Sequence, residues 1–329
     1  MSQTAGLALA NFLHYLPRDV EEWLLFYDSR FTNETARRVS EAIRAREVVD
    51  LRRTSPDEIS RLDETYFPEK HVGALFFSLF QANEKHSNEY LATFDRLNVF
   101  DTWPSSRCRI VDEVTDQTFD ALFEATPAAL ADECWLKLAQ CQRSGRALFR
   151  GAAQSLDIHY EPSSGVAYTG FESYEFNIPS GEIAFHPVAI DGTIAFSGWI
   201  IGSIPFGQKH GHISHDQLTI TFDGRRITNI SGTAAQLIDD LEAVFAGSPG
   251  LCEVNEFGIG LNGAASSLAR RHKVGLQWME KCRGLHFGLG AELTEHISDH
   301  RLRKTHHHLD LVFDHGELLI NDEIILSWP

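Results

Sequence analysis

The sequence lacks several features that define well-known classes of protein. Its five cysteines are scattered, odd in number and without CxxC spacing, which argues against both a disulfide framework and a zinc knuckle. No apolar run is long enough to span a membrane, and no basic leader precedes the modest apolar stretch at residues 6–16. We therefore expect a cytoplasmic protein with reduced thiols and without a membrane partner.

Basic residues are also scarce. The chain has 29 Lys and Arg against 46 Asp and Glu, a formal net charge of −17. Because affinity for nucleic acid comes mainly from clustered Lys and Arg, we do not expect a nucleic-acid partner. The 329 residues are 43% hydrophobic and 23% charged, which is typical of a globular protein long enough for two domains.

The N-terminal part has the pattern of an α/β domain. Residues 22–28 form an apolar run of strand length, residues 32–45 have capping chemistry and helical spacing, and residues 48–51 resume a strand pattern. A strand, a helix and a strand in this order predict a parallel sheet. Residues 71–80 and 109–114 are candidates for further buried strands. A helix is expected to start at Thr126-Pro127 and run to Ser144-Gly145, and residues 1–154 form the predicted α/β domain with a parallel sheet.

From about residue 155 the pattern changes to short alternating segments broken by Gly, Pro and Asp. Residues 217–222 alternate between polar and apolar side chains, and Asp223-Gly224 is a hairpin signal. One helix is expected at about residues 232–246. Residues 155–329 are therefore predicted to form a β-rich α+β domain. Twelve of the 16 histidines lie beyond residue 180, so the chemistry is expected in this half.

The first candidate site is the histidine tract that runs into the apolar segment at residues 304–313. In an extended chain alternate side chains share a face, so His308 and Asp310 point the same way, with His306 one step further out. Imidazole and carboxylate together can bind a divalent cation. Taken alone, the tract is also typical of a solvated turn before a strand.

Three more segments offer ligand-type side chains. Glu182 lies at the head of a predicted strand, Glu256 precedes a glycine-punctuated apolar stretch, and His286 stands in a similar stretch at residues 284–290. Glycines inside a strand often mark a close approach to the backbone. The alternatives are a solvated glutamate and a hydrogen-bonded core histidine.

In this order the segments resemble the M29 aminopeptidases, a family of two-metal exopeptidases. The segments that carry the resemblance are residues 177–183, 256–259, 286–290, 308–310 and 316–322. The resemblance covers residues 155–329 well and the N-terminal half only in outline. It implies that one or two divalent ions (Zn, Mn, Co or Fe) are bound by Glu182, Glu256, His286, His308 and Asp310, with Glu256 a candidate bridge.

The chain departs from two related patterns. The 2,5-dihydroxypyridine dioxygenases are a similar, iron-dependent branch with a site of two histidines and one aspartate, and this chain has Glu256 where their first histidine is expected. The peptidases carry a tyrosine a few residues after the histidine that His286 matches. Here that stretch is residues 291–296, and no tyrosine follows Tyr174. Glu292, Glu295 or His296 could substitute there as ligands, but none is a phenol.

The resemblance implies metal-dependent amide hydrolysis at a peptide terminus, and implies a homodimer. The alternative is a catalytically lapsed module that binds a peptide and presents it to a partner enzyme. Such proteins occur in the biosynthesis of ribosomally made peptide natural products, the crocagin pathway being one example. A separate histidine cluster at residues 209–216 could bind metal through His210, His212 and His215, but an exposed loop is the interpretation that we favour there.

Overall fold

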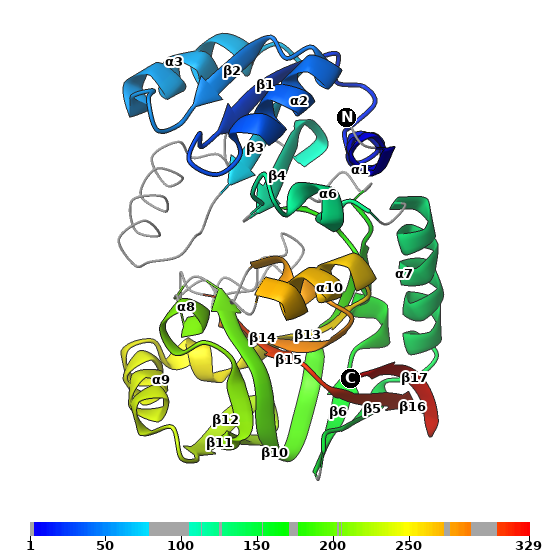
Figure 1. Ribbon diagram of the computed structural model, residues 1–329. Coiled ribbons are helices and arrows are strands. Elements are labelled where there is room, and N and C mark those ends of the chain that lie inside the picture. The colour runs from blue at the N-terminus through cyan, green and yellow to red at the C-terminus, as the bar shows by residue number, and fades with distance from the viewer. Residues whose placement is uncertain are drawn as a thin grey trace. The chain divides into compact units, whose positions relative to one another are not determined.

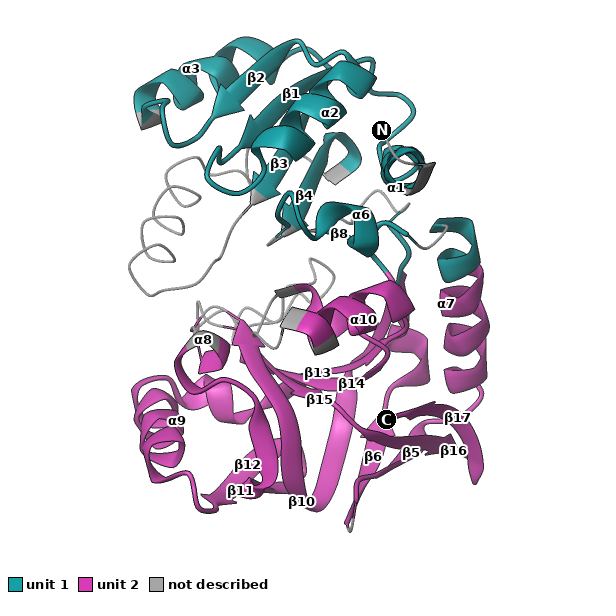
Figure 2. Ribbon diagram, in the orientation of Figure 1, with its two compact units in different colours: residues 1–131, 168–180 teal, residues 132–167, 181–329 magenta. Residues whose placement is uncertain are grey.

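The computed structural model describes residues 3–78, 105–112, 114–124, 127–152, 154–170, 177–202, 204, 206–272, 277–290 and 308–329. The chain divides into two compact units (Figure 2). One comprises residues 1–131 and 168–180, and the other comprises residues 132–167 and 181–329.

The first unit contains a five-stranded parallel sheet in the order β2-β1-β3-β4-β8 (Figure 1). Its strands are β1 (Glu22–Tyr27), β2 (Glu47–Asp50), β3 (Val72–Ser78), β4 (Cys108–Asp112) and β8 (Asn177–Ile178). Its helices are α1 (Gln3–Leu13), α2 (Asn33–Ile43), α3 (Pro56–Tyr66), the 3-10 turn η1 (Ser105–Arg107) and α6 (Phe119–Leu122). Helix α2 joins β1 to its parallel neighbour β2, so the predicted strand, helix and strand are confirmed.

The apolar composition of these strands follows from burial on both faces. Four consecutive residues of β1, Trp23 to Phe26, are buried. Leu24 and Phe26 belong to a core cluster with Ile59 of α3, and Phe26 stacks on Phe76 with ring centroids 4.5 Å apart. A continuous apolar run is what a parallel strand between helical layers requires.

The second unit is built on a twelve-stranded sheet in which the order along the main path is β17-β16-β5-β6-β10-β15-β14-β13-β9-β7, with β11 and β12 attached to β10. From β17 to β9, neighbouring strands are antiparallel. The strands are β5 (Arg146–Arg150), β6 (Ser155–Tyr160), β7 (Val166–Tyr168), β9 (Glu182–Phe185), β10 (Pro187–Gly202), β11 (Ile213–Asp223), β12 (Arg226–Ser231), β13 (Val254–Gly260), β14 (Gly284–Gly290), β15 (His308–Phe313), β16 (Gly316–Ile320) and β17 (Glu323–Trp328).

The helices of this part of the chain are α7 (Pro127–Cys141), α8 (Phe206–His210), α9 (Ala235–Gly247) and α10 (Gly263–His272), with the 3-10 turns η2 (Pro162–Ser164), η3 (Pro249–Cys252) and η4 (Gln277–Lys281). Helix α7 begins where predicted and ends at Cys141, three residues before the predicted end at Ser144, and α9 lies close to the predicted helix at residues 232–246. The fold class is therefore confirmed: a parallel α/β part is followed by a β-rich α+β part.

Each sheet contains one strand from the other side of the predicted domain boundary at residue 154. Strand β5 precedes that residue and pairs with β6 in the large sheet, while β8 follows it and pairs with β4 in the small sheet. The predicted limits of 1–154 and 155–329 mark a change of local pattern along the chain. The compact units instead follow the pairing of the strands.

The large sheet has one aromatic face. Phe287 on β14 packs against Phe222, Phe257 and Phe313, with ring centroids 5.6, 6.4 and 5.6 Å away. These side chains alternate along their strands with smaller or polar residues that point to the opposite face. The aromatic face therefore supports the strands that carry the candidate ligands.

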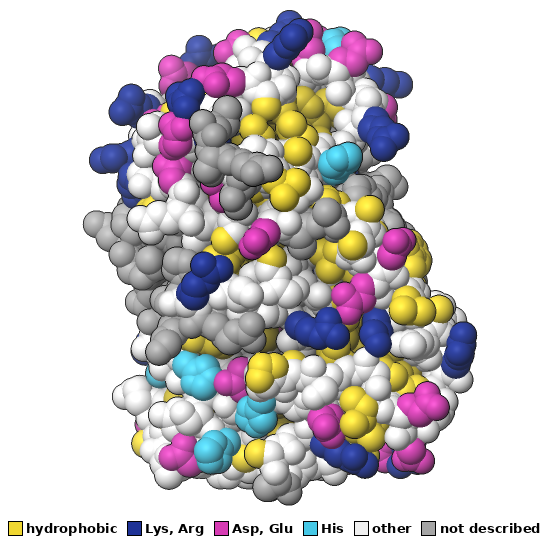
Figure 3. Space-filling model, turned by 45° about the vertical axis from the view of Figure 1, so that its right-hand side comes forward, with side chains coloured by type: hydrophobic (Ala, Val, Ile, Leu, Met, Phe, Trp, Pro, Cys, Tyr) yellow, Lys and Arg dark blue, Asp and Glu magenta, His cyan; other side chains and the backbone are white. Residues whose placement is uncertain are grey.

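Two surface properties bear on possible partners. No helix among the described residues is long and apolar enough to cross a membrane. On the face shown in Figure 3, acidic and basic side chains are interspersed over the described surface rather than gathered by sign.

Candidate metal centre

The four segments singled out in the sequence lie on four neighbouring strands of the large sheet. Glu182 begins β9, Glu256 lies on β13, His286 lies on β14, and His308 and Asp310 lie on β15. These strands are adjacent in the order β15-β14-β13-β9. The structure thus brings together residues that are up to 128 positions apart in the chain.

The register of the strands puts all five side chains on one face. His286 is paired with Gly258 on one side, and Gly288 is paired with both Glu256 and Asp310. Glu182 is paired with Gly260. Directly paired residues share a face, as do residues two apart on a strand. The face opposite the aromatic core is therefore a row of acids and histidines separated by glycines.

The glycines make room for the ligands. A Cβ at Gly258 would overlap the ring of His286, lying 2.8 Å from its Cδ2 and closer still to Nε2 and Cε1. A Cβ at Gly288 would lie 2.8 Å from both the Cβ of Glu256 and the Cε1 of His308. The sequence-based expectation that these glycines mark a close approach to the backbone is confirmed, and what approaches is a neighbouring ligand-type side chain.

The donor atoms form two groups that share Glu256. In the first, the Nε2 of His286 is 2.8 Å from Glu182 Oε1 and 3.8 Å from Glu256 Oε1. In the second, the Nε2 of His308 is 2.9 Å from Asp310 Oδ1 and 4.0 Å from Glu256 Oε2. The two oxygens of Glu256 thus face different histidines, which is the placement that a bridging carboxylate requires.

Electrostatics couple the charges of these groups. Burial lowers the pKa of His286, but the carboxylates of Glu182 and Glu256 outweigh burial and raise this pKa well above its usual range. Burial opposes ionisation of Glu256, yet His286 and His308 hold the pKa of its carboxyl below its usual value.

The donor set fits a divalent cation. Donor atoms of Glu182, Glu256 and His286 all lie within 4.8 Å of one another. Glu182 Oε1, His286 Nε2 and Asp310 Oδ2 are buried and accept or donate no hydrogen bond among the described residues. The first two are 2.8 Å apart without hydrogen-bond alignment. Two ligands of one ion, each about 2.1 Å from it, lie about 3 Å apart. Imidazole and carboxylate donors suit Zn, Mn, Co or Fe.

Sequence reasoning missed Lys281, at the end of η4. Its side chain is 9% exposed, and its Nζ donates to Glu182 Oε2 and lies 3.0 Å from Glu280 Oε1. Residues 280–283 read Glu-Lys-Cys-Arg, a run typical of a solvated turn, so nothing local indicates that the lysine is buried. Only the pairing of β9 with β13, against which η4 packs, places Glu182 beside it.

Other candidates from the sequence have different outcomes. His306, His307 and residues 291–296 lie outside the described residues. In the cluster at 209–216, His210 binds Asp240 at 2.7 Å and His212 binds Asp314 at 2.5 Å. These histidines have separate carboxylate partners, and the segment ends α8 and begins β11. The expected exposure is confirmed for Lys209, His212, His215 and Asp216, but the segment is not one loop, because a helix end and a strand start occupy most of it.

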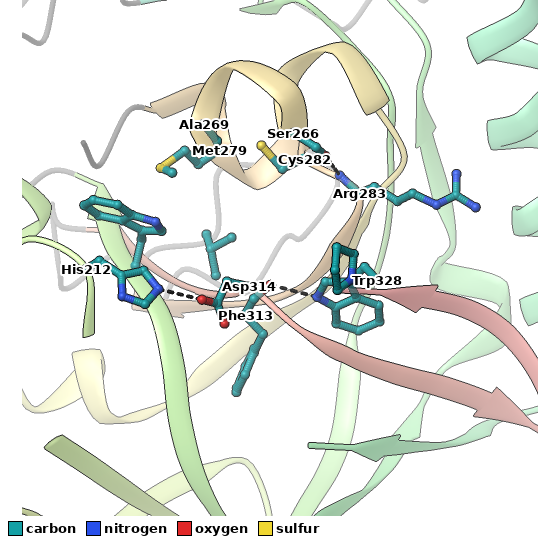
Figure 4. Close-up of a pocket in the computed structure, with 12 residues that line it drawn as sticks. His212, Ser266, Ala269, Met279, Cys282, Arg283, Phe313, Asp314 and Trp328 are labelled. Carbon is teal, nitrogen blue, oxygen red and sulfur yellow. Dashed lines mark hydrogen bonds and ion pairs between the residues drawn. The ribbon is translucent and has the colours of Figure 1, made fainter. Parts of the chain in front are cut away.

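A cavity of about 440 Å³ lies on the same face of the sheet as the candidate ligands. Its wall includes Val312, which follows Asp310 by two positions on β15, and Trp199 of β10. Figure 4 shows His212 and Asp314 turned toward each other at one end, with Met279 and Cys282 above them. Phe313 points away from this space, toward the aromatic face. The lining is mostly apolar, with one ion-paired end.

Comparison with known proteins shows a likeness in fold alone. No protein-family model and no curated protein matches the chain. Among solved structures, the 2,5-dihydroxypyridine dioxygenase from Pseudomonas putida KT2440 is similar, with a TM-score of 0.61 at 14% identity. The match covers 99% of this chain and 96% of that chain. The expected similarity to the 2,5-dihydroxypyridine dioxygenases is therefore confirmed, as a distant likeness in fold.

Proposed function

We propose that this protein is a metal-dependent hydrolase that acts on an amide bond at a peptide terminus. The observation that carries the proposal is the donor set itself: three carboxylates and two histidines on one face, with Glu256 turned toward both histidines. A divalent ion bound there would supply an activated water and polarise the scissile carbonyl. Zn, Mn, Co and Fe are the candidate ions.

The protein's own residues have distinct parts in this proposal. Glu182 and Asp310 are 2% and 1% exposed, so their charges act in a site from which most water is excluded. Glu256 lies between the two histidines, and its side chain is 22% exposed. In this proposal the substrate therefore reaches the centre past Glu256. The adjacent apolar cavity is of a size to accept one hydrophobic side chain of the peptide.

A second candidate function is peptide binding without turnover. Two observations favour it: Lys281 takes one oxygen of Glu182, and no tyrosine follows Tyr174 in the sequence. A protein with this fold could then hold a precursor peptide for a partner enzyme, as a homodimer or alone. Oxygen chemistry is the third possibility, because His286, His308 and Asp310 are ligand types that suit Fe(II).

One set of measurements separates the three functions. Purified protein is loaded with Zn²⁺, Mn²⁺ or Fe²⁺, and amino-acid release from short peptides is measured beside oxygen uptake with 2,5-dihydroxypyridine. Calorimetry with the same peptides reports binding. We expect amino-acid release that a chelator and the H308A substitution both abolish. Binding without release would favour the peptide-binding module, and oxygen uptake would favour a dioxygenase.

A further inference from the structure

Lys281 is fixed beside the candidate metal centre by its backbone as well as by its side chain. The backbone N–H of Asn262 donates to the carbonyl of Lys281 at 2.9 Å, and η4 packs so closely on β13 that a Cβ at Gly260 would lie 2.6 Å from the carbonyl oxygen of Glu280. With its backbone fixed in this way, the buried ammonium is kept at Glu182.

Glu182 is the main counter-charge of this ammonium. Lys281 also contacts Glu280, but the side chain of Glu280 is 21% exposed and water solvates its charge. Glu182 is 2% exposed, and its two oxygens face Lys281 and His286. A buried ammonium and a buried carboxylate each cost much free energy unless they are paired. The pair therefore neutralises the charge of Glu182 within the centre.

The remaining charge decides how many divalent ions the centre can hold. The five predicted ligands include three carboxylates, those of Glu182, Glu256 and Asp310. With Glu182 neutralised by Lys281, the uncompensated charge lies on Glu256 and Asp310, on either side of His308. One divalent cation balances these two charges. A second ion, between Glu182 and His286, would then meet no net negative charge and would be repelled by the ammonium.

We propose that Lys281 makes this centre mononuclear: its ammonium neutralises Glu182, so that one divalent ion binds at Glu256, His308 and Asp310. The inference rests on the proposed function, since it assumes that the donor set binds metal. It goes further by assigning Lys281 as a positioning residue that sets the number and the place of the ions. The close approach of Glu182 to His286 then belongs to an ion-paired cluster.

Metal stoichiometry tests this inference directly. Full-length protein is dialysed against Mn²⁺ and analysed for bound metal, and electron paramagnetic resonance distinguishes isolated Mn²⁺ from a coupled pair. We expect one equivalent and an uncoupled signal for the wild type. The K281M substitution should raise binding to two equivalents and give a coupled signal. K281R keeps the positive charge, so it should stay at one equivalent.

A double substitution and a ligand substitution complete the design. K281M/E182Q removes both charges and should bind one equivalent, because the second ion needs an ionised Glu182. D310N should lose the single ion of the wild type. Circular dichroism establishes that each variant is folded. If K281M does not fold without metal, refolding it with Mn²⁺ should recover a protein with two equivalents.

Each outcome bears on a different claim. Two equivalents in the wild type, or one in K281M, would overturn the inference and leave the proposed function standing. A D310N variant that keeps its ion would overturn the assigned place of that ion. No metal in the wild type would refute the proposed function and, with it, the inference that one ion binds at Glu256, His308 and Asp310.

Discussion

Replacing Gly258 with alanine tests how the sheet makes room for its ligands. The added Cβ would lie 2.8 Å from Cδ2 of His286 and closer to two other atoms of that ring, whereas carbon atoms pack best at about 3.5–4.0 Å. The ring is 1% exposed and has Glu182 and Glu256 beside it, so it cannot turn into solvent. It must move by more than about 1 Å, or the strands must separate. Overpacking of this kind destabilises a protein by about 1–3 kcal/mol.

The substitution therefore tests stability and metal affinity separately. In urea titrations with chelator present, the free energy of unfolding should fall by about 1–3 kcal/mol. In calorimetry with Mn²⁺ or Zn²⁺, affinity should fall if His286 is a ligand, because the displaced ring loses its place beside Glu182. Under the mononuclear arrangement proposed above, the loss of affinity should be small.

Gly263, the first residue of α10, provides a matched control. A Cβ there would meet no atom within 4 Å, so G263A adds the same methyl group without a clash. Alanine is preferred to glycine in a helix, so G263A should keep or slightly raise stability. A G258A protein as stable as G263A would refute the argument that this glycine accommodates His286.

Three further predictions concern the core, the pH dependence and the metal. F287A removes a fully buried ring that packs on Phe222, Phe257 and Phe313. It should lower the free energy of unfolding, measured in urea, by about 3–5 kcal/mol, and a decrease of about 1 kcal/mol or less would contradict this packing argument. Burial opposes the ionisation of Asp314, but His212 holds the pKa of its carboxyl below the usual value, so its contribution to stability is present above the unfolded-state pKa and lost as the pH falls through the folded-state pKa. In urea titrations the wild type should therefore be more stable than D314N near neutrality, and this difference should disappear in acid, below the folded-state pKa. Metal at a free concentration of 100 times Kd should stabilise the folded wild type by about 2.7 kcal/mol and so raise its thermal midpoint. An equal rise in H308A would show that the ion binds elsewhere.

Much of the local structure could be read from the sequence. The parallel unit at residues 22–51, the helix from Pro127 to Cys141 and the hairpin at Asp223-Gly224 all follow from periodicity, capping and turn chemistry that act over a few neighbouring residues. The shared face of His308 and Asp310 follows from the period of two in a strand. These features are local, so one sequence is enough to predict them.

Only the tertiary structure decided the rest. Antiparallel pairing in the order β15-β14-β13-β9 makes one row from four separate segments, and strands β5 and β8 each join a sheet on the other side of the predicted boundary at residue 154. Lys281 lies in a run with the polarity of a solvated turn, and only its contact with Glu182 shows that it is buried. Such pairings depend on which apolar faces and glycines fit together across the whole chain. The sequence determined which residues could bind metal, and the fold decided that they lie together with a lysine among them.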